Sequence, residues 1–295
     1  MFILPEKREF MSYLILKPLN CSLNQVKIAL NFINLHPKKI MTASLSNGSL
    51  YTFIENKIAT VEFSHPASNS FPSELLQRLT DELNKLSLNS EVSVIILKSE
   101  GEKAFCAGAS FDELLQIDNL EKGEKFFSGF ANVINAMRKC SKLIIGRIQG
   151  KAVGGGVGLA SACDYAFATE AASIKLSEFT IGIGPFVIAP AVERKMGVAA
   201  LAELTIAGHE WQNAYWAKEQ GLYARVYETI SEMDKEIEFL ALKLSNYNPK
   251  ALTEMKTVLW ENTSHWDSLL YERAAISGQL VLSDFTKNAL SAFKK

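Results

Sequence analysis

Four short apolar runs separated by stretches of helical pattern constrain the fold of this chain more than any other feature. The runs read IATVEF, SVIILK, KLIIGRIQ and YAFAT, and they are rich in β-branched residues or flanked by turn residues. Between the first two, PSELLQRLTDELNKLSL spaces its leucines as an amphipathic helix does, with Ser73 as a candidate N-cap. Alternating strands and helices are typical of an α/β fold with a parallel sheet. The sequence beyond residue 196 is mostly helical in pattern, so helices are expected to follow this core.

The first 40 residues differ from the rest of the chain. They show no clear period, whereas Met41 opens a turn and two strand-like runs. One hypothesis is that Met41 is the true initiator and that the residues before it are not native. We expect an N-terminal extension over 1–48, an α/β core over 49–240 and a helical region over 241–295.

Composition limits the partners of the protein. Hydrophobic residues make up 48% of the 295 residues and the formal net charge is -1, which gives no broad electrostatic reason to expect nucleic acid or an anionic membrane. No run approaches the roughly 18 apolar residues of a membrane span, and the N-terminus lacks the order of a signal peptide. The four cysteines have no metal-binding spacing. These features favour a cytoplasmic protein with reduced thiols and no metal.

The glycine-rich stretch GKAVGGGVGLASACD, residues 150–164, lies between a strand-like run and a helical one. Helix N-termini carry unpaired N–H groups and bind anions or developing oxyanions, and glycine lets a ligand approach the backbone. Close packing of helix on sheet is one alternative. A dinucleotide-binding loop is another, although the third glycine of that fingerprint is replaced by Ser161.

Two further stretches carry candidate chemistry. EKAFCAGASFDELL puts small residues between a strand and a helix, where they either present N–H groups or make a plain tight turn. IKLSEFTIGIGPF holds one acid, Glu178, among apolar residues. A carboxyl group in an apolar pocket has a raised pKa and suits proton transfer, whereas the alternative is a loop carboxylate that caps a helix or pairs with a lysine.

Together these stretches resemble the crotonase, or enoyl-CoA hydratase/isomerase, superfamily from about Ser49 to Lys295. FCAGAS is similar to the F-x-A-G-A-D segment of that family, and the stretch from IIGRIQ to KLSE is similar to its signature. HPASNSF resembles an early segment of the family, with Asn69 at its asparagine position. The resemblance implies a spiral of ββα units with a C-terminal helical region that builds trimers or hexamers.

The resemblance also implies a coenzyme A thioester as substrate, with no separate cofactor. The N–H groups of Ala109 and Gly155 would form an oxyanion hole for the thioester oxygen, and Glu178 would be the general acid/base. An apolar lid of Phe179, Ile181 and Phe186 would raise its pKa. The substrate-binding positions carried over are Ala107, Gly108, Ser110, Gly154, Gly158 and Phe186.

The chain departs from the family pattern at two of these positions. Gly158 stands where two-glutamate hydratases have their first glutamate, and Ser110 replaces the usual aspartate. The pattern GGGVGL…LSE…GIGPFVIAP resembles a bacterial branch assigned as methylglutaconyl-CoA hydratases of leucine breakdown. The leading expectation is therefore hydration of a branched enoyl-CoA such as 3-methylglutaconyl-CoA. The alternatives are a single-glutamate enoyl-CoA isomerase, a decarboxylase or polyketide-pathway homologue, and a non-catalytic CoA-binding subunit.

Weaker candidates are expected to be structural. Asp112 and Glu113 follow the oxyanion loop and read as helix-surface charge, and Cys106 lies in an apolar run typical of packing. No histidine stands in a pattern with a nucleophile and an acid. By resemblance alone, Lys294 and Lys295 are expected near the adenine and phosphates of coenzyme A.

Overall fold

The computed structural model describes residues 47–292. The expectations for residues 1–40, including an initiator at Met41, and for Lys294 and Lys295 lie outside the described residues. The strands are β1 (Ser49–Glu55), β2 (Ile58–Ser64), β3 (Val94–Ser99), β4 (Ala104–Cys106), β5 (Leu143–Ile148), β6 (Lys151–Val153), β7 (Tyr165–Thr169), β8 (Ser173–Lys175), β9 (Gln212–Asn213) and β10 (Arg225–Tyr227). The helices are α2 (Ser73–Leu88), α3 (Phe111–Leu114), α4 (Leu120–Lys139), α5 (Gly155–Ala162), the 3-10 helix η2 (Glu178–Ile181), α6 (Ala189–Ile206), α7 (Ala214–Glu219), α8 (Ile230–Ser245), α9 (Pro249–Leu259), α10 (Trp266–Leu280) and α11 (Asp284–Ala292).

Six strands form the larger sheet in the order β1-β2-β3-β5-β7-β10. The hairpin of β1 and β2 is antiparallel, and every later neighbour pairs in parallel. The four apolar runs identified in the sequence are the central strands β2, β3, β5 and β7. Most of their β-branched residues are buried because helices cover both faces, as is typical of parallel sheets.

A smaller sheet in the order β4-β6-β8-β9 collects the segments that carry the candidate chemistry. Each of β3, β5 and β7 in the large sheet is followed by a short strand of the small sheet and then by a helix, which is the expected ββα repeat. The three short strands β4, β6 and β8 run parallel, so the turns after them meet at one edge.

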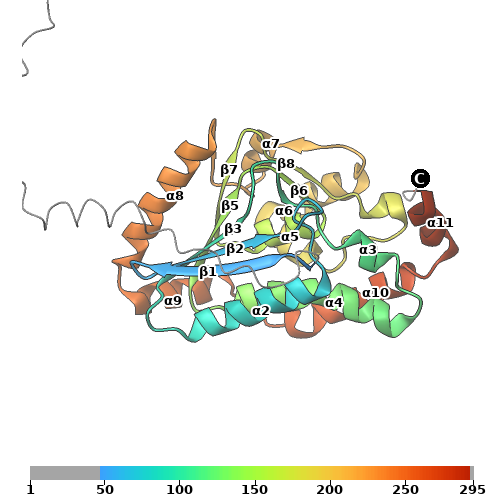
Figure 1. The fold of residues 1–295 in the computed structure, drawn as a ribbon, viewed down its shortest axis with the longest axis horizontal. Coiled ribbons are helices and arrows are strands. Elements are labelled where there is room, and N and C mark those ends of the chain that lie inside the picture. Colours follow the sequence, from blue (N-terminus) through green and yellow to red (C-terminus); the bar gives the residue numbers. More distant parts are fainter. Residues whose placement is uncertain (1–46, 293–295) are drawn as a thin grey trace, which may run out of the picture. The chain divides into compact units, whose positions relative to one another are not determined.

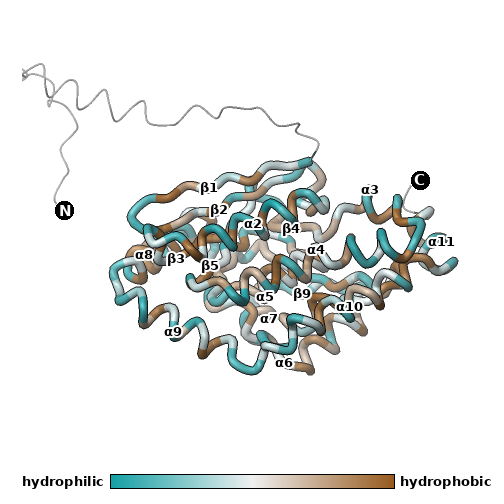
Figure 2. The backbone as a smooth tube through the Cα atoms, turned by 90° about the horizontal axis from the view of Figure 1, so that it is seen from below, coloured by the Kyte–Doolittle hydropathy of each residue, from teal (hydrophilic) through white to brown (hydrophobic). Residues whose placement is uncertain are grey.

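Helices cover the two faces of the large sheet (Figure 1). On one face α8 packs its buried Met233, Ile237 and Ala241 against Ile58 and Val94 of the strands. On the other face α2 and α4 pack together, and α10 packs along α4. Figure 2 shows hydrophobic and hydrophilic residues alternating along α2, as an amphipathic helix requires.

Two glycines bring α4 and α10 into close backbone contact. A Cβ atom on Gly123 would lie 2.8 Å from the carbonyl oxygen of Gly278, and one on Gly278 would lie 2.8 Å from the amide nitrogen of Glu124. No side chain fits at either position without separating the helices. This crossing fixes α10 of the C-terminal helical region against the core helix that reaches the site described below.

The expected α/β crotonase fold is confirmed, with one difference in a helix cap. Helix α2 begins at Ser73 itself, with Pro72 in the N-cap position and no cap from its own side chain. Glu113 supplies the acceptor instead, because its Oε2 receives hydrogen bonds from the Ser73 N–H at 2.9 Å and the Ser73 hydroxyl at 2.6 Å. Within residues 47–292, no helix is both long and apolar enough to cross a membrane.

Candidate active site

A cavity of about 420 Å³ opens where the turns after β4, β6 and β8 meet. Its walls come from these turns, from the phenylalanines of α4, and from η2 and the loop that follows it. Its polar side chains are those of Lys175, Ser177, Glu178, Thr180 and Ser277. The remaining lining is almost entirely apolar or glycine, as is typical of a small-molecule site.

Two unpaired amide groups lie at the base of this cavity. Gly155 is the first residue of α5, and its N–H donates to no described residue; the same holds for the N–H of Ala109. A Cβ atom on Gly108 would lie 3.5 Å from the Gly155 nitrogen, so the two turns are in contact. Free N–H donors at a helix start suit a developing oxyanion.

Three consecutive glycines are required here by three different neighbours. Gly154 has a φ of +53°, and a Cβ atom on it would lie 2.7 Å from Oε1 of Glu178. A Cβ atom on Gly155 would lie 2.2 Å from the ring of Phe130, and one on Gly156 would lie 2.4 Å from the Cys106 carbonyl oxygen. The glycines therefore allow the Glu178 carboxylate, the Phe130 ring and strand β4 to pack against the start of α5.

Glu178 is the one carboxylate in the described lining of the cavity. The residue as a whole is half-buried, but its Oε2 is buried and has no hydrogen-bond partner among the described residues. Burial raises the pKa of Glu178 to about 7, against a smaller opposing effect of its own backbone N–H. A carboxyl group with this pKa both accepts and returns a proton near neutral pH.

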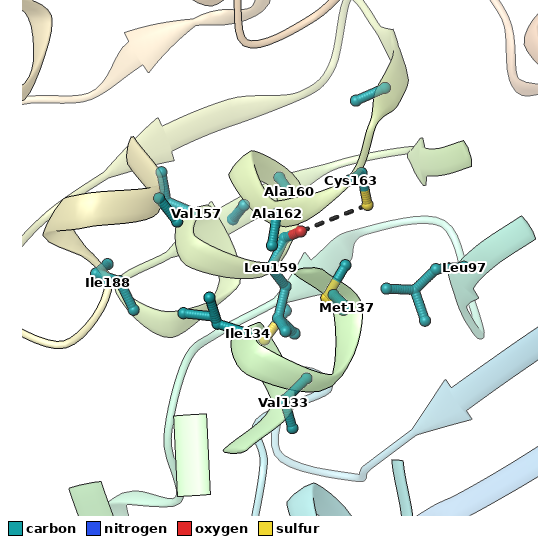
Figure 3. Close-up of a cluster of buried hydrophobic side chains, with 14 of the residues drawn as sticks. Leu97, Val133, Ile134, Met137, Val157, Leu159, Ala160, Ala162, Cys163 and Ile188 are labelled. Atoms are coloured by element: carbon teal, nitrogen blue, oxygen red, sulfur yellow. Dashed lines mark hydrogen bonds between the residues drawn. The ribbon is translucent and has the colours of Figure 1, made fainter. Parts of the chain in front are cut away.

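The space beside Gly158 is filled by Ile188. A Cβ atom on Gly158 would lie 2.5 Å from Cγ2 of Ile188 and 3.8 Å from the terminal methyl of Ile134. Figure 3 shows both isoleucines among the apolar side chains packed around α5. Gly158 itself is buried and does not line the cavity, whereas Ile188 does. The wall at this point is therefore apolar.

The structure brings most of the predicted site residues together and leaves three outside. Ala107, Gly108, Ala109, Gly154, Gly155 and Glu178 all line the cavity. Ser110 does not, because its hydroxyl caps α3 by accepting from the Glu113 N–H at 3.3 Å. Gly158 lies beneath Ile188, and Phe186 packs against Gly184 of the cavity wall without lining the cavity itself.

The predicted lid needs a similar correction. Phe179 is 49% exposed and, like Phe186, does not line the cavity. Of the three proposed lid residues only Ile181 does. The apolar surroundings of Glu178 come instead from residues beyond η2 and from α4, among them Ile183, Val187 and Phe130.

The motif residue Asn69 and the weaker candidate Cys106 take structural roles. Asn69 donates to the carbonyls of Glu100 and Ala104, each at 2.9 Å, and so ties the loop after β2 to β4. Burial raises the pKa of the Cys106 thiol to about 12, which makes it a packing residue rather than a nucleophile. No three acidic, histidine or cysteine side chains within residues 47–292 are grouped as metal ligands would be.

Phe130 and Ser277 line the cavity but carried no signal in the sequence, because the apolar pattern of their helices reads as ordinary core. Ile188 belongs to the GIGPFVIAP stretch, but no role at the site was predicted for it. Their part in the site depends on how α4, the start of α6 and α10 pack, which no local pattern in the sequence encodes.

Comparison with known proteins decides the family. The family model described as enoyl-CoA hydratase/isomerase matches residues 53–291. The chain belongs to the enoyl-CoA hydratase/isomerase family. The solved structure of an enoyl-CoA hydratase from Bacillus halodurans superposes with a TM-score of 0.75 at 19% identity, over 82% of this chain and 99% of that one. This likeness supports the fold alone.

Curated relatives in the family include proteins named as isomerases and proteins named as hydratases. The peroxisomal Delta(3,5)-Delta(2,4)-dienoyl-CoA isomerase of Arabidopsis thaliana is 29% identical over 227 residues, which are 71% of this chain and 80% of that protein. The mitochondrial methylglutaconyl-CoA hydratase of Rattus norvegicus is 33% identical over 167 residues, 56% of this chain and 52% of the relative. The chain is therefore a hydratase or isomerase family enzyme, and the choice between the two reactions depends on its own site.

Proposed function

We propose that this protein adds water to a short, branched enoyl-CoA such as 3-methylglutaconyl-CoA. One observation carries the proposal: Glu178 places a buried, unpartnered carboxylate oxygen in the same cavity as the free N–H groups of Ala109 and Gly155. Support for the substrate comes from the motif resemblance and from the hydratase of Rattus norvegicus. A cytoplasmic location and assembly into trimers or hexamers remain predictions.

In the proposed reaction Glu178 begins as a carboxylate. It takes a proton from a water molecule as the water oxygen bonds to the β-carbon of the enoyl group. The double-bond electrons move onto the thioester oxygen, where the two N–H groups stabilise the enolate. Glu178 then gives the proton to the α-carbon, so one water is added and the carboxylate is restored. Each preorganised donor is worth about 3–4 kcal/mol of transition-state stabilisation.

A double-bond shift is the second candidate, and Ile188 favours it. With Ile188 over Gly158, the described lining has no second carboxylate to hold the attacking water opposite Glu178. A single carboxylate suffices for isomerisation, in which it removes a proton from the α-carbon of a 3-enoyl-CoA and returns it to the γ-carbon. Hydration passes through a β-hydroxy enolate and isomerisation through a dienolate, and the same oxyanion hole would stabilise either one.

A substrate panel tests the proposal. The protein is incubated with 3-methylglutaconyl-CoA, crotonyl-CoA and a 3-enoyl-CoA, and products are separated by chromatography before their masses are measured. Hydration adds 18 Da, whereas an isomer keeps the mass of its substrate and is identified by its retention time. We expect the largest kcat/KM for hydration of 3-methylglutaconyl-CoA. The Glu178→Gln variant should lose about 10²–10⁴-fold in turnover.

The outcomes separate the candidates. Turnover of the 3-enoyl-CoA alone would replace hydration by isomerisation. Thioester binding without turnover of any substrate would favour a non-catalytic CoA-binding subunit, and wild-type turnover by Glu178→Gln would reject the role given to that residue.

A further inference from the structure

Ser277 is, besides Glu178, a residue of the cavity wall with a buried side-chain oxygen that has no hydrogen-bond partner among the described residues. Its side chain is 1% exposed, and its Oγ makes no hydrogen bond to a described residue. A serine inside a helix can donate to the carbonyl four residues earlier, yet Ser277 on α10 does not. Of the buried, unpartnered side-chain atoms in the described chain, only those of Glu178 and Ser277 belong to residues of the cavity wall.

The position of Ser277 is fixed by the helix crossing beside it. The next residue, Gly278, packs against Gly123 at the start of α4, while Phe130 farther along α4 packs against Gly155. Gly123 and Phe130 are seven residues apart, which is about 10 Å along a helix axis. Ser277 therefore lies toward the end of the cavity remote from the oxyanion donors, where the far end of an acyl chain would reach.

The surroundings of Ser277 at that end are apolar. Val281, the C-cap residue of α10, belongs to a buried cluster with Leu114, Phe126 and Ile183, and the last three also line the cavity. A purely aliphatic acyl chain would fill this space but leave the hydroxyl without a partner, which is unfavourable for a buried polar group.

Positive charge is scarce in the described lining of the cavity. Lys175 is the one cation of the described lining, and its Nζ donates to the His209 carbonyl at 2.8 Å and lies 5.6 Å from the Trp211 ring. The ammonium group is thus engaged at the surface. Recognition at the far end therefore depends on the Ser277 hydroxyl and not on an ion pair.

We propose that Ser277 is a specificity-determining residue that hydrogen-bonds an oxygen atom at the distal end of the acyl chain. The preferred substrates are then acyl-CoA thioesters with a distal hydroxyl or carboxyl oxygen, over methyl-ended chains of equal length. This inference rests on the proposed acyl-CoA function and narrows its substrate class.

Binding of unreactive thioesters tests it without turnover. Dissociation constants are measured by calorimetry for matched saturated thioesters with five and six carbons, ending in a methyl, a hydroxyl or a carboxyl group. We expect the wild-type protein to bind the oxygen-bearing thioesters roughly tenfold more tightly than the methyl-ended ones, the scale of one hydrogen bond. Ser277→Ala should reduce this preference to less than about threefold by the same reasoning. Ser268→Ala is the matched control, because Ser268 is an exposed serine on the same helix.

The hydroxyl-ended and carboxyl-ended thioesters distinguish recognition of a neutral oxygen from recognition of a charged one. Preference for either oxygen-bearing end that disappears in Ser277→Ala supports the proposal, whether or not the enzyme hydrates 3-methylglutaconyl-CoA. A wild-type protein without preference, a preference that survives in Ser277→Ala, or equal weakening of all thioesters by that variant would overturn it. Failure of every thioester to bind would overturn both this inference and the proposed function.

Discussion

Ile188 occupies the space that any side chain at position 158 would need. A Cβ atom there would lie 2.5 Å from Cγ2 and 2.8 Å from Cβ of Ile188. The family resemblance assigns this position to the first of the two catalytic glutamates. The two residues therefore form a matched pair, in which the absence of one side chain and the presence of the other make this wall apolar.

This pairing predicts the behaviour of a restored glutamate. Gly158→Glu alone should destabilise the protein by about 1–3 kcal/mol or more, because it overpacks a filled core. Truncation to alanine would leave the Ile188 Cβ in place, so the compensating change is Ile188→Gly. We expect the double variant Gly158→Glu/Ile188→Gly to recover part of the lost stability and to raise the ratio of hydration to isomerisation. Thermal unfolding and the product panel measure both effects, with Ile188→Gly alone as control; an unchanged ratio in a folded double variant would contradict the argument.

Activity should follow the ionisation of Glu178. In both candidate reactions the carboxylate form starts the proton transfer, and burial raises its pKa to about 7. We therefore expect kcat/KM to fall about tenfold per pH unit below about pH 7 and to level off above it. The measurement is kcat/KM from pH 5 to 9, and a flat profile across pH 6–8 would argue against Glu178 as the base.

The same shift predicts an effect on stability. Since the folded pKa of about 7 exceeds the ordinary glutamate value of 4.5, the folded state binds the proton more tightly than the unfolded state. Stability from this group is fully present below about pH 4.5 and is lost as the pH rises through 7. Glu178→Gln removes the ionisation, so its stability relative to wild type should rise by about 2–3 kcal/mol between pH 5 and pH 8. Urea unfolding at both pH values tests this, and a pH-independent difference would show that the carboxylate is not buried.

Much of this architecture was accessible from the sequence because it depends on local patterns. The runs that form β2, β3, β5 and β7 are mostly apolar, and the glycines at 154–156 mark a helix start that must accept close neighbours. The site predictions that were wrong or missing concern positions whose surroundings depend on packing between distant segments. Ser110 caps α3, Phe186 packs against Gly184 without lining the cavity, and Ser277 lies in the lining because α10 crosses α4.

Gly154 should be intolerant of even a methyl group. Its φ of +53° disfavours other residues, and an added Cβ would lie 2.7 Å from Oε1 of Glu178. We expect Gly154→Ala to lower kcat by at least about tenfold by displacing the carboxylate, since small misplacements of catalytic groups are costly. Gly101→Ala is the control, because Gly101 also has a positive φ but has nothing within 4 Å of an added Cβ. Equal activity of the two variants would count against the close packing of Gly154 and Glu178.

A buried ion pair joins α9 to the core and predicts a stability effect far from the cavity. Lys256 Nζ lies 2.6 Å from Oδ2 of Asp164, and both side chains are almost fully buried. Asp164 also accepts from the Ile144 N–H and from the Trp260 indole, each at 2.7 Å. Lys256→Met leaves this carboxylate buried without its cation, so unfolding free energy should fall by about 3–5 kcal/mol. The exposed neighbour Lys250→Met on the same helix should change it by less than about 0.5 kcal/mol. Denaturant unfolding compares the two variants, and equal stabilities would mean that Asp164 finds its compensation elsewhere.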